Sequence, residues 1–213
     1  FMVPNFIDTT QFMPGDKAAA RRHFDLPQDA LIVLCCAAIR RYHKRIDHLL
    51  AEFELAAGRT DRDILLVVAG GREADTDEII AEGSTRLGTK VRFLPNVPRN
   101  GMPMLYQAAD VFTLASLHEM FGIVLLEAMA TGLPVVCNDA PIFRSVVGPA
   151  GVYRDIDIPG NLADGLTVLF DDEHRAAVAR EARPWVDGRF STTVVMRDIV
   201  SMYASVLDGA RND

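Results

Sequence analysis

The sequence predicts an α/β fold in which a parallel sheet is flanked by helices. Short apolar runs alternate with longer amphipathic stretches along most of the 213 residues. Parallel neighbours in a sheet need crossover connections of about a dozen residues or more, and the amphipathic stretches can supply them. The apolar runs are continuous rather than alternating, which is typical of strands buried on both faces. We therefore expect a Rossmann-like sheet.

Each expected strand is a short apolar run. The strands are Leu31–Ala38, Ile64–Ala69, Val91–Leu94, Val111–Ala115 and one opening at Pro134–Cys137. The helices between them show helical spacing of apolar residues, and most end before a glycine. They are Ile46–Ala57 before Gly58, Glu73–Leu87 before Gly88, Met102–Ala109, and Phe121–Ala130 before Gly132. From Asn161 onward we expect mostly helix, with a break near Pro184 and a last helix over Thr192–Leu207.

The opening of the chain differs from the rest because Pro4, Pro14, Gly15 and Pro27 interrupt regular elements. We interpret residues 1–28 as a linker with the first elements, residues 29–190 as the Rossmann-like domain and residues 191–213 as a C-terminal helix. The chain begins with Phe1 rather than Met. We therefore expect either a processed start or a part of a larger protein.

Composition and charge exclude several classes of protein. Hydrophobic residues make up 49% and charged residues 24%, a balance typical of a globular protein rather than a disordered one. The longest apolar run, Leu31–Ile39, is far shorter than the roughly 20 residues that span a bilayer. No secretory signal pattern is visible at the start. The net charge of −7 disfavours nucleic acid as a partner.

The three cysteines, Cys35, Cys36 and Cys137, all lie within apolar runs. An odd count with two adjacent residues does not suit a disulfide framework. Neither a Cys-x-x-Cys pair nor histidines at ligand spacing indicate a metal site. We expect buried, reduced, structural thiols, which favours a cytoplasmic location.

Ligands of an open parallel sheet bind beyond the carboxyl ends of its strands, and four segments of this chain belong there. The first, residues 40–45, reads Arg-Arg-Tyr-His-Lys-Arg. Arginine in a forked geometry and lysine as a point charge would hold a phosphate group. A solvated charge run is the alternative, although cations at a helix start oppose the helix dipole.

The second segment contains Gly70 and Gly71, and the third contains Asn96 and Val97. Glycine lets a backbone approach a ligand closely, and exposed amides after the Val91–Leu94 strand could read the edge of a base. Tight turns favour the same residue types. Neither segment decides the ligand by itself.

The fourth segment holds two glutamates, Glu119 and Glu127. Glu119 precedes a helix whose expected first turn is Phe121, Gly122, Ile123 and Val124. The free amides of such a turn form an anion site for a diphosphate or for sugar hydroxyls. Glu127 lies in an apolar helix, where a carboxylate needs a partner such as ribose hydroxyls. A solvent-facing glutamate is the alternative interpretation for each.

Residues 119–136 read EMFGIVLLEAMATGLPVV. This string resembles, almost position by position, the pattern E-x-F-G-x-x-x-x-E-A-M-A-x-G-x-P-V-V of retaining GT-B glycosyltransferases of the group often called GT4, the glycosyl transferases group 1. Its two glutamates correspond to the E-x7-E signature of that group. The full string is more specific than the two glutamates alone.

Other parts of the chain resemble the same family in the same order. Residues 3–8 (VPNFID) with residues 12–14 (FMP) are similar to its interdomain linker, V-P-N-G-V-D followed by F-x-P. Residues 91–97 (VRFLPNV) are similar to its strand and turn beside the base. The resemblance covers essentially the whole chain and implies the C-terminal, donor-binding lobe of a GT-B enzyme.

The basic segment corresponds to the Arg/Lys pair with which the family grips the nucleotide diphosphate. Lys44 matches the lysine, and Arg40 is our choice for the arginine, with Arg41 as its rival, because Ile39 stands at the usual arginine position. Three glycines usual in the family are replaced here by Phe6, Arg45 and Asn96.

The resemblance implies transfer of a sugar from a UDP-, GDP- or ADP-sugar to an acceptor hydroxyl with retention, without a metal or other cofactor. It assigns Arg40, Lys44 and Glu119 to catalysis, and Glu127 to the ribose. The other donor-binding residues it implies are Gly70, Gly71, Asn96, Val97, Phe121, Gly122, Ile123 and Val124.

The resemblance also implies that the acceptor is bound by an N-terminal lobe absent from this chain. Residues 1–28 would then be the interdomain linker, residues 191–213 would pack toward that lobe, and the chain alone would bind a donor without transferring the sugar. Membrane association would be peripheral, at the inner face of the membrane and through that lobe. The alternatives are a nucleotide-sugar epimerase or sugar phosphorylase of GT-B fold, or a non-catalytic nucleotide-sugar-binding module.

Overall fold

The computed structural model describes residues 3–209 and confirms the predicted fold class. Six parallel strands form one sheet in the order β3-β2-β1-β4-β5-β6. This is the Rossmann order, in which the direction of winding reverses between β1 and β4. The strands are β1 (Leu31–Cys36), β2 (Ile64–Gly70), β3 (Val91–Pro95), β4 (Val111–Thr113), β5 (Val135–Asn138) and β6 (Gly151–Arg154). Strand β6, a short and partly exposed edge strand, was not predicted.

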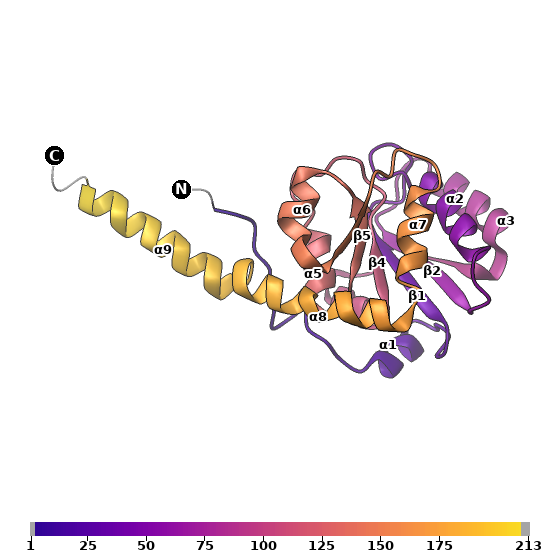
Figure 1. The fold of residues 1–213 in the computed structure, drawn as a ribbon, viewed down its shortest axis with the longest axis horizontal. Coiled ribbons are helices and arrows are strands. Elements are labelled where there is room, and N and C mark those ends of the chain that lie inside the picture. The colour runs from indigo at the N-terminus through magenta and orange to yellow at the C-terminus, as the bar shows by residue number, and fades with distance from the viewer. Residues whose placement is uncertain (1–2, 210–213) are drawn as a thin grey trace.

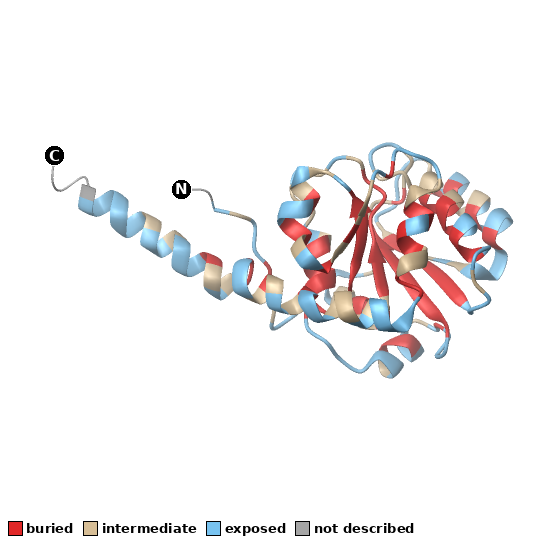
Figure 2. Cartoon of the chain, in the orientation of Figure 1, coloured by how far each residue is buried: buried red, intermediate tan, exposed pale blue. Residues whose placement is uncertain are grey.

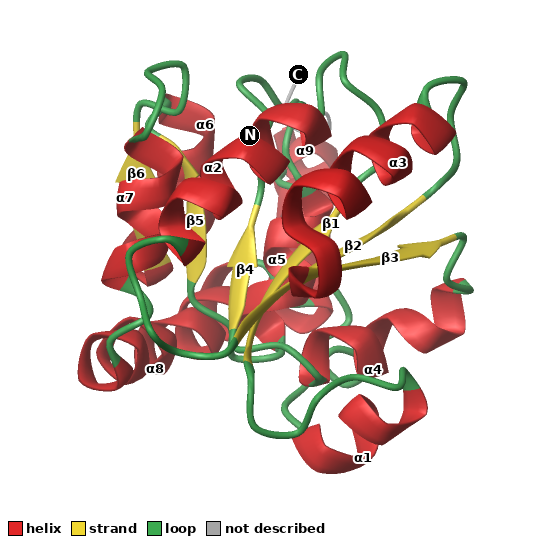
Figure 3. Cartoon of the chain, turned by 90° about the vertical axis from the view of Figure 1, so that its right-hand side faces the viewer, coloured by secondary structure: helices red, strands yellow, loops and turns green. Residues whose placement is uncertain are grey.

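Helices cover both faces of the sheet (Figures 1 and 3). Helices α2, α3 and α7 pack side by side on one face, and α5 packs against α8 on the other. The helices are α1 (Lys17–His23), α2 (Ile46–Ala57), α3 (Thr76–Leu87), α4 (Met102–Gln107), α5 (Ile123–Ala130), α6 (Pro141–Val147), α7 (Asn161–Val168), α8 (Asp172–Arg189) and α9 (Thr192–Gly209).

The hydrophobic core runs through the middle of the sheet. Every residue of β1, β4 and β5 is buried, and so is every residue of β2 except the last, Gly70 (Figure 2). The edge strands β3 and β6 are only partly covered. Helices on both faces therefore explain why the inner strands read as continuous apolar runs.

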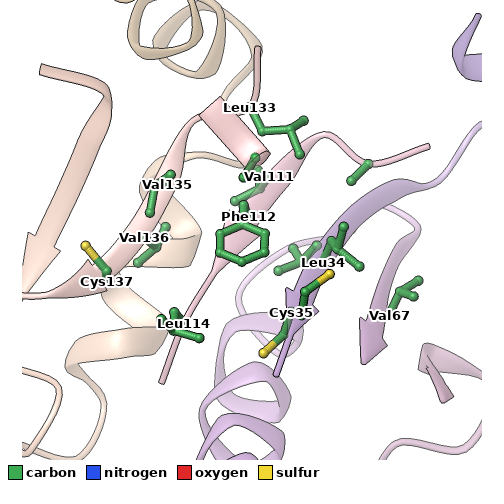
Figure 4. Packing of buried hydrophobic residues seen from close by; sticks show 14 of the residues in the cluster. Leu34, Cys35, Val67, Val111, Phe112, Leu114, Leu133, Val135, Val136 and Cys137 are labelled. Carbon is green, nitrogen blue, oxygen red and sulfur yellow. The ribbon is translucent and has the colours of Figure 1, made fainter. Parts of the chain in front are cut away.

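The cysteines belong to this core, as the sequence predicts. Figure 4 shows Cys35 of β1 and Cys137 of β5 among apolar side chains of neighbouring strands. All three thiols are free and buried. Burial raises the pKa of the Cys35 thiol to about 12, so this thiol stays protonated and unreactive near neutral pH.

The predicted helix break near Pro184 is wrong, because α8 continues through this proline. The side chains on either side are anchored by tertiary contacts. Arg183 donates to the Ala130 and Thr9 carbonyls at 2.7 and 3.0 Å, and Trp185 Nε1 donates to the Val146 carbonyl at 2.9 Å. These contacts outweigh the amide hydrogen bond that a proline removes. The chain turns instead at Ser191, between α8 and α9.

The N-terminal segment packs on the domain and contains one helix that was not predicted. Helix α1 forms between two of the interrupting prolines, because Asp16 caps its first turn and accepts from the Ala19 amide at 2.9 Å. The Arg21 side chain is buried and lies 2.6 Å from Asp110, which precedes β4. Ile7 pairs with Ser191, the residue just before α9. Helix α9 itself projects away from the sheet (Figure 1).

Candidate functional site

A cleft of about 690 Å³ opens at the carboxyl ends of β1, β2 and β3, beside the N-terminal half of α5. Helix α5 follows β4, so the cleft lies where the chain winds in opposite directions from β1 and β4. Ligands of open α/β sheets bind at this topological switch point. The lining residues are Cys36, Ala37, Ala38, Ala69, Gly70, Gly71, Asn96, Val97, Arg99, Met102, Ile123, Val124 and Glu127.

Seven of the predicted site residues line this cleft although they come from three separate parts of the sequence. They are Gly70, Gly71, Asn96, Val97, Ile123, Val124 and Glu127. The remaining five, Arg40, Lys44, Glu119, Phe121 and Gly122, do not line it. The structure therefore brings the predicted base- and ribose-binding segments together in one cleft and leaves the predicted catalytic residues outside its wall.

The two glycines at the carboxyl end of β2, Gly70 and Gly71, are favoured for different structural reasons. A Cβ at Gly70 would overlap the carbonyl of Ala37, so this glycine permits the close approach of two backbones. A Cβ at Gly71 would meet nothing, which leaves its position open to the cleft. Close packing therefore explains why residue 70 is a glycine, whereas it does not explain why residue 71 is one.

Asn96 adopts a left-handed conformation with φ of +58°. Asparagine tolerates this region better than most residues, which explains how it stands where the family usually has glycine. The backbone amide of Asn96 donates to the Gly70 carbonyl at 2.8 Å, and its side-chain oxygen accepts from the backbone amide of Arg72 at 3.2 Å. These bonds join the loop after β2 to the turn after β3.

The first turn of α5 begins two residues later than predicted. The helix starts at Ile123 because Gly122, with φ of +81°, is its N-cap. Phe121 and Gly122 thus precede the helix, while Ile123 and Val124 form its first turn and line the cleft. Amides at these positions have no partner within an α-helix, so they are available to a ligand. The predicted anion site therefore depends on Ile123 and Val124 rather than on Phe121.

Glu127 lies deeper in the cleft, on α5. The residue is only 5% exposed, and its Oε2 accepts a hydrogen bond from the Tyr106 hydroxyl at 2.6 Å. Burial raises the pKa of Glu127, while the Tyr106 hydrogen bond and the positive charge of Arg99 lower it in part. The solvent-facing alternative for Glu127 is wrong.

Lys44 and Glu119 meet beside the cleft. Lys44 Nζ lies 2.5 Å from Glu119 Oε1, and both side chains are mostly covered. The loop after β1 positions Lys44 between two left-handed residues, His43 and Arg45, with φ of +66° and +51°. Glu119 also lies against the helix start, because a Cβ on Gly122 would stand 3.8 Å from its Cγ. The loops after β1 and β4 thus bring a cation and a carboxylate together beside the start of α5.

Arg40 and Arg41, the two candidates for the predicted diphosphate-binding arginine, differ in their ion pairs. The Arg41 guanidinium is held by Glu82 at 2.9 Å and Asp47 at 3.4 Å, on the helices α3 and α2. Arg40 Nε donates to the Tyr42 carbonyl at 2.8 Å, and its only ion pair within residues 3–209 is a long one of 3.7 Å with Glu73. Arg40 is therefore the freer of the two cations.

The sequence analysis missed two polar residues near Glu127: Arg99, which lines the cleft, and Tyr106, which is buried behind it. Tyr106 read as an ordinary residue of the short helix after β3, and its contact with Glu127 joins positions 21 residues apart. Arg99 lines the cleft, and its guanidinium makes no hydrogen bond or ion pair within the described part of the chain. No local pattern marks either residue, since the tertiary fold alone places them here.

A second cavity, of about 370 Å³, lies at the opposite end of the sheet, before β4 and β5. Its charges are already paired with each other, Lys17 with Asp110 at 2.6 Å and Arg175 with Asp172. We therefore assign the candidate site to the cleft at the carboxyl ends of the strands, where Arg99 and Glu127 remain available.

Residues 3–209 contain neither a metal-binding cluster of the usual ligands nor a helix suited to cross a membrane. No group of three or more His, Cys, Asp or Glu side chains in this range is arranged to hold a metal ion. No helix in this range has both the length and the apolar composition needed to cross a membrane.

Comparison with known families assigns most of the chain to one family. Residues 16–185 match the family described as Glycosyl transferases group 1, which is most of the chain. The chain belongs to this family. The D-inositol 3-phosphate glycosyltransferase of Corynebacterium urealyticum is 32% identical over 93% of this chain and 49% of its own length. This chain of the glycosyl transferases group 1 thus spans about half the length of the curated relatives it matches.

Solved glycosyltransferase structures share the fold. Sucrose-phosphate synthase of Thermosynechococcus elongatus superposes with a TM-score of 0.83 at 23% identity, over 98% of this chain and 53% of that one. The Anabaena protein Alr3699/HepE, solved in complex with UDP and glucose, superposes with a TM-score of 0.80 at 19% identity, over 95% of this chain and 56% of that one. The predicted GT-B lobe is therefore confirmed as the fold of this group 1 chain.

Proposed function

We propose that this chain is the donor-binding lobe of a retaining glycosyltransferase and binds a nucleoside diphosphate sugar in the cleft. The observation that carries the proposal is the convergence on the cleft of Glu127, the first turn of α5 and the loops after β2 and β3. Family membership makes sugar transfer the chemistry to test first.

Each part of a nucleotide sugar has a matching group. Glu127 would accept hydrogen bonds from ribose hydroxyls, and the backbone at Gly71, Asn96 and Val97 would border the base. The amides of α5 and the carboxylate of Glu119 would orient the sugar. Lys44 and Arg40 would stabilise the diphosphate as negative charge grows on it, which lowers the barrier for its departure.

The reaction would proceed on one face of the sugar. The bond between the anomeric carbon and the diphosphate oxygen breaks, the acceptor oxygen forms its bond from the same face, and the acceptor proton passes to the departing phosphate. This route retains configuration without a covalent enzyme intermediate. It is therefore unlike the two-carboxylate route of retaining glycosidases. We propose that it needs no metal, because Lys44 and Arg40 supply the positive charge.

The acceptor would be bound by a second lobe in a longer protein. Helix α9 carries exposed apolar side chains, which a partner lobe would cover. They are Met196, Val200, Tyr203, Val206 and Leu207. We propose that residues 191–209 pack toward that lobe and that residues 3–28 lead to it, whereas residues 210–213 lie outside the described part. Cytoplasmic location and peripheral membrane contact through that lobe remain parts of the proposal.

A thermal-shift screen with UDP-, GDP- and ADP-sugars tests the proposal. Uridine is the first choice, since the Anabaena protein holds UDP and glucose. One donor class should raise the melting temperature, and no shift with any of them would contradict nucleotide-sugar binding. In the longer protein, release of the nucleoside diphosphate together with a glycosylated acceptor would separate a transferase from an epimerase, a phosphorylase or a non-catalytic module.

A further inference from the structure

Among the described residues, Tyr106 is the only one whose side chain hydrogen-bonds to the carboxylate of Glu127. Its hydroxyl donates to Oε2 at 2.6 Å, a distance typical of a charge-assisted bond. Within residues 3–209, the second carboxylate oxygen, Oε1, accepts no hydrogen bond from the protein. Glu127 lines the cleft, so one oxygen is held by the protein and the other is left for a ligand.

The ring of Tyr106 is fixed from two sides. It is fully buried, with the Phe12 ring 5.9 Å away in an edge-to-face arrangement and the Phe112 ring 5.8 Å away. Phe112 belongs to β4, whereas Phe12 belongs to the N-terminal segment. Aromatic pairs of this geometry add stability beyond the area they bury. The hydroxyl of Tyr106 therefore cannot swing away from Glu127 without repacking the core.

The polar groups around Glu127 favour its ionised form. Burial raises the pKa of Glu127, and the groups that face it are Tyr106 of α4, Arg99 before α4 and Cys36 of β1. The Tyr106 hydrogen bond lowers the pKa of Glu127 again, and so does Arg99. Burial also raises the pKa of the Tyr106 hydroxyl well above its usual value, which keeps Tyr106 a proton donor.

We propose that Tyr106 is a positioning residue for donor binding: it holds Oε2 of Glu127 so that Oε1 can accept hydroxyls of a vicinal diol in the cleft. This inference rests on the proposed function, because the ribose of the nucleotide is the diol. Phe12 and Phe112 form the walls that keep the tyrosine in place. Tyr106 touches no ligand itself and acts through Glu127.

Tyr106→Phe removes only the hydroxyl and is the direct test. The probes are UDP, GDP and ADP and their 2′,3′-dideoxy counterparts, titrated against the wild-type chain and the variant. The wild type should prefer a ribonucleotide over its dideoxy form, and Tyr106→Phe should weaken ribonucleotide binding about tenfold, the effect of one bond to a charged group. Dideoxynucleotide binding should stay within about twofold, because it does not use the bond.

Tyr153→Phe is the matched control. The Tyr153 hydroxyl donates to the Gly148 carbonyl at 2.6 Å, on the edge strand β6 and outside the cleft. Its loss should leave both affinities unchanged. If Tyr106→Phe does not fold, Phe12→Leu loosens the same ring while keeping the hydroxyl. It should reduce the preference for the ribonucleotide, and an unchanged preference in this variant would overturn the inference.

The pH dependence of ribonucleotide binding distinguishes a positioning role of Tyr106 from a purely structural one, because only the positioning role acts through the pKa of Glu127. Loss of the hydrogen bond raises the pKa of Glu127. As pH is lowered, the Glu127 carboxylate of Tyr106→Phe should therefore become protonated, and ribonucleotide binding should be lost, at a higher pH than in the wild type. If Tyr106→Phe folds and keeps both the ribose preference and the pH profile of the wild type, the role proposed for Tyr106 is wrong, while the proposed function still stands. Equal binding of ribo- and dideoxynucleotides by the wild type would also overturn the role proposed for Tyr106. Failure of the wild type to bind any nucleotide would overturn the proposed function and this inference together.

Discussion

The Lys44 ammonium group lies 2.5 Å from the Glu119 carboxylate, although 75 positions separate the two residues in the sequence. The pair joins the loop after β1 to the loop after β4, on either side of the point where the sheet reverses its winding. A bound diphosphate would give the lysine a second anionic partner. In the proposed site, the pair would link donor binding to charge stabilisation on the diphosphate.

Lys44→Ala should lower sugar transfer by about 100-fold or more in the longer enzyme, as loss of one charge-stabilising donor typically does. Steady-state rates of nucleoside diphosphate release measure this effect. Lys90→Ala is the control, because Lys90 is exposed and precedes β3 at the opposite end of the sheet. A rate for Lys44→Ala equal to that of the control would remove Lys44 from the catalytic residues.

Arg40→Ala and Arg41→Ala should differ in their effect on diphosphate binding. Arg41 is committed to Glu82 and Asp47, so its loss should change the affinity for a nucleoside diphosphate by less than about twofold. Loss of Arg40 should weaken that affinity about tenfold while leaving nucleoside binding unchanged. Parallel titrations with the diphosphate and the nucleoside measure both effects, and the reverse order would make Arg41 the diphosphate ligand.

Glu127→Gln should stabilise the fold as pH rises while it weakens the donor site. Burial raises the pKa of Glu127 above its unfolded value near 4.5. A carboxyl group with a raised pKa favours folding fully below its unfolded pKa, and this contribution is lost as pH rises through its folded pKa. Melting temperatures of the variant and the wild type should thus be similar near pH 4.5 and diverge, in favour of the variant, as pH rises above that value. A constant difference across this range would contradict the assignment.

Glu52→Ala should destabilise the domain without acting on the cleft. Glu52 is only 2% exposed, and its carboxylate accepts from the Gly160 and Ala163 amides at 2.7 and 3.0 Å, at the start of α7. Leaving these buried amides unpaired should cost about 1–3 kcal/mol in the free energy of unfolding. Glu54→Ala, in which an exposed carboxylate on the same helix is removed, should cost less than about 1 kcal/mol. Denaturant unfolding of both variants measures the difference.

The sequence was most informative where one local rule determined the structure. Helix α2 runs from Ile46 to Ala57 as predicted, because apolar spacing and the following Gly58 act within one element. The start of α5 was misplaced because the backbone conformation of Gly122, rather than apolar spacing, sets it. The prediction of a helix break near Pro184 was wrong, because Arg183 and Trp185 hydrogen-bond to carbonyls of distant segments.

The same distinction holds for the site. Gly70, Gly71, Asn96 and Val97 could be predicted because they end or follow strands, and parallel strands bring their carboxyl ends together. Tyr106 and Arg99 were missed because their relation to Glu127 exists only after α4 and α5 have packed. The pairing of Lys44 with Glu119 was likewise invisible in the sequence, although both residues had been singled out.

Calorimetric titration of the 213-residue chain with UDP, GDP and ADP tests the central claim most directly, with Glu127→Gln measured beside the wild type. We predict that one of the three binds the wild type with one site per chain and binds the variant at least about tenfold more weakly. Absence of binding by all three would contradict the claim that this cleft is a nucleotide-sugar site. Equal affinity of the wild type and the variant would contradict it as well.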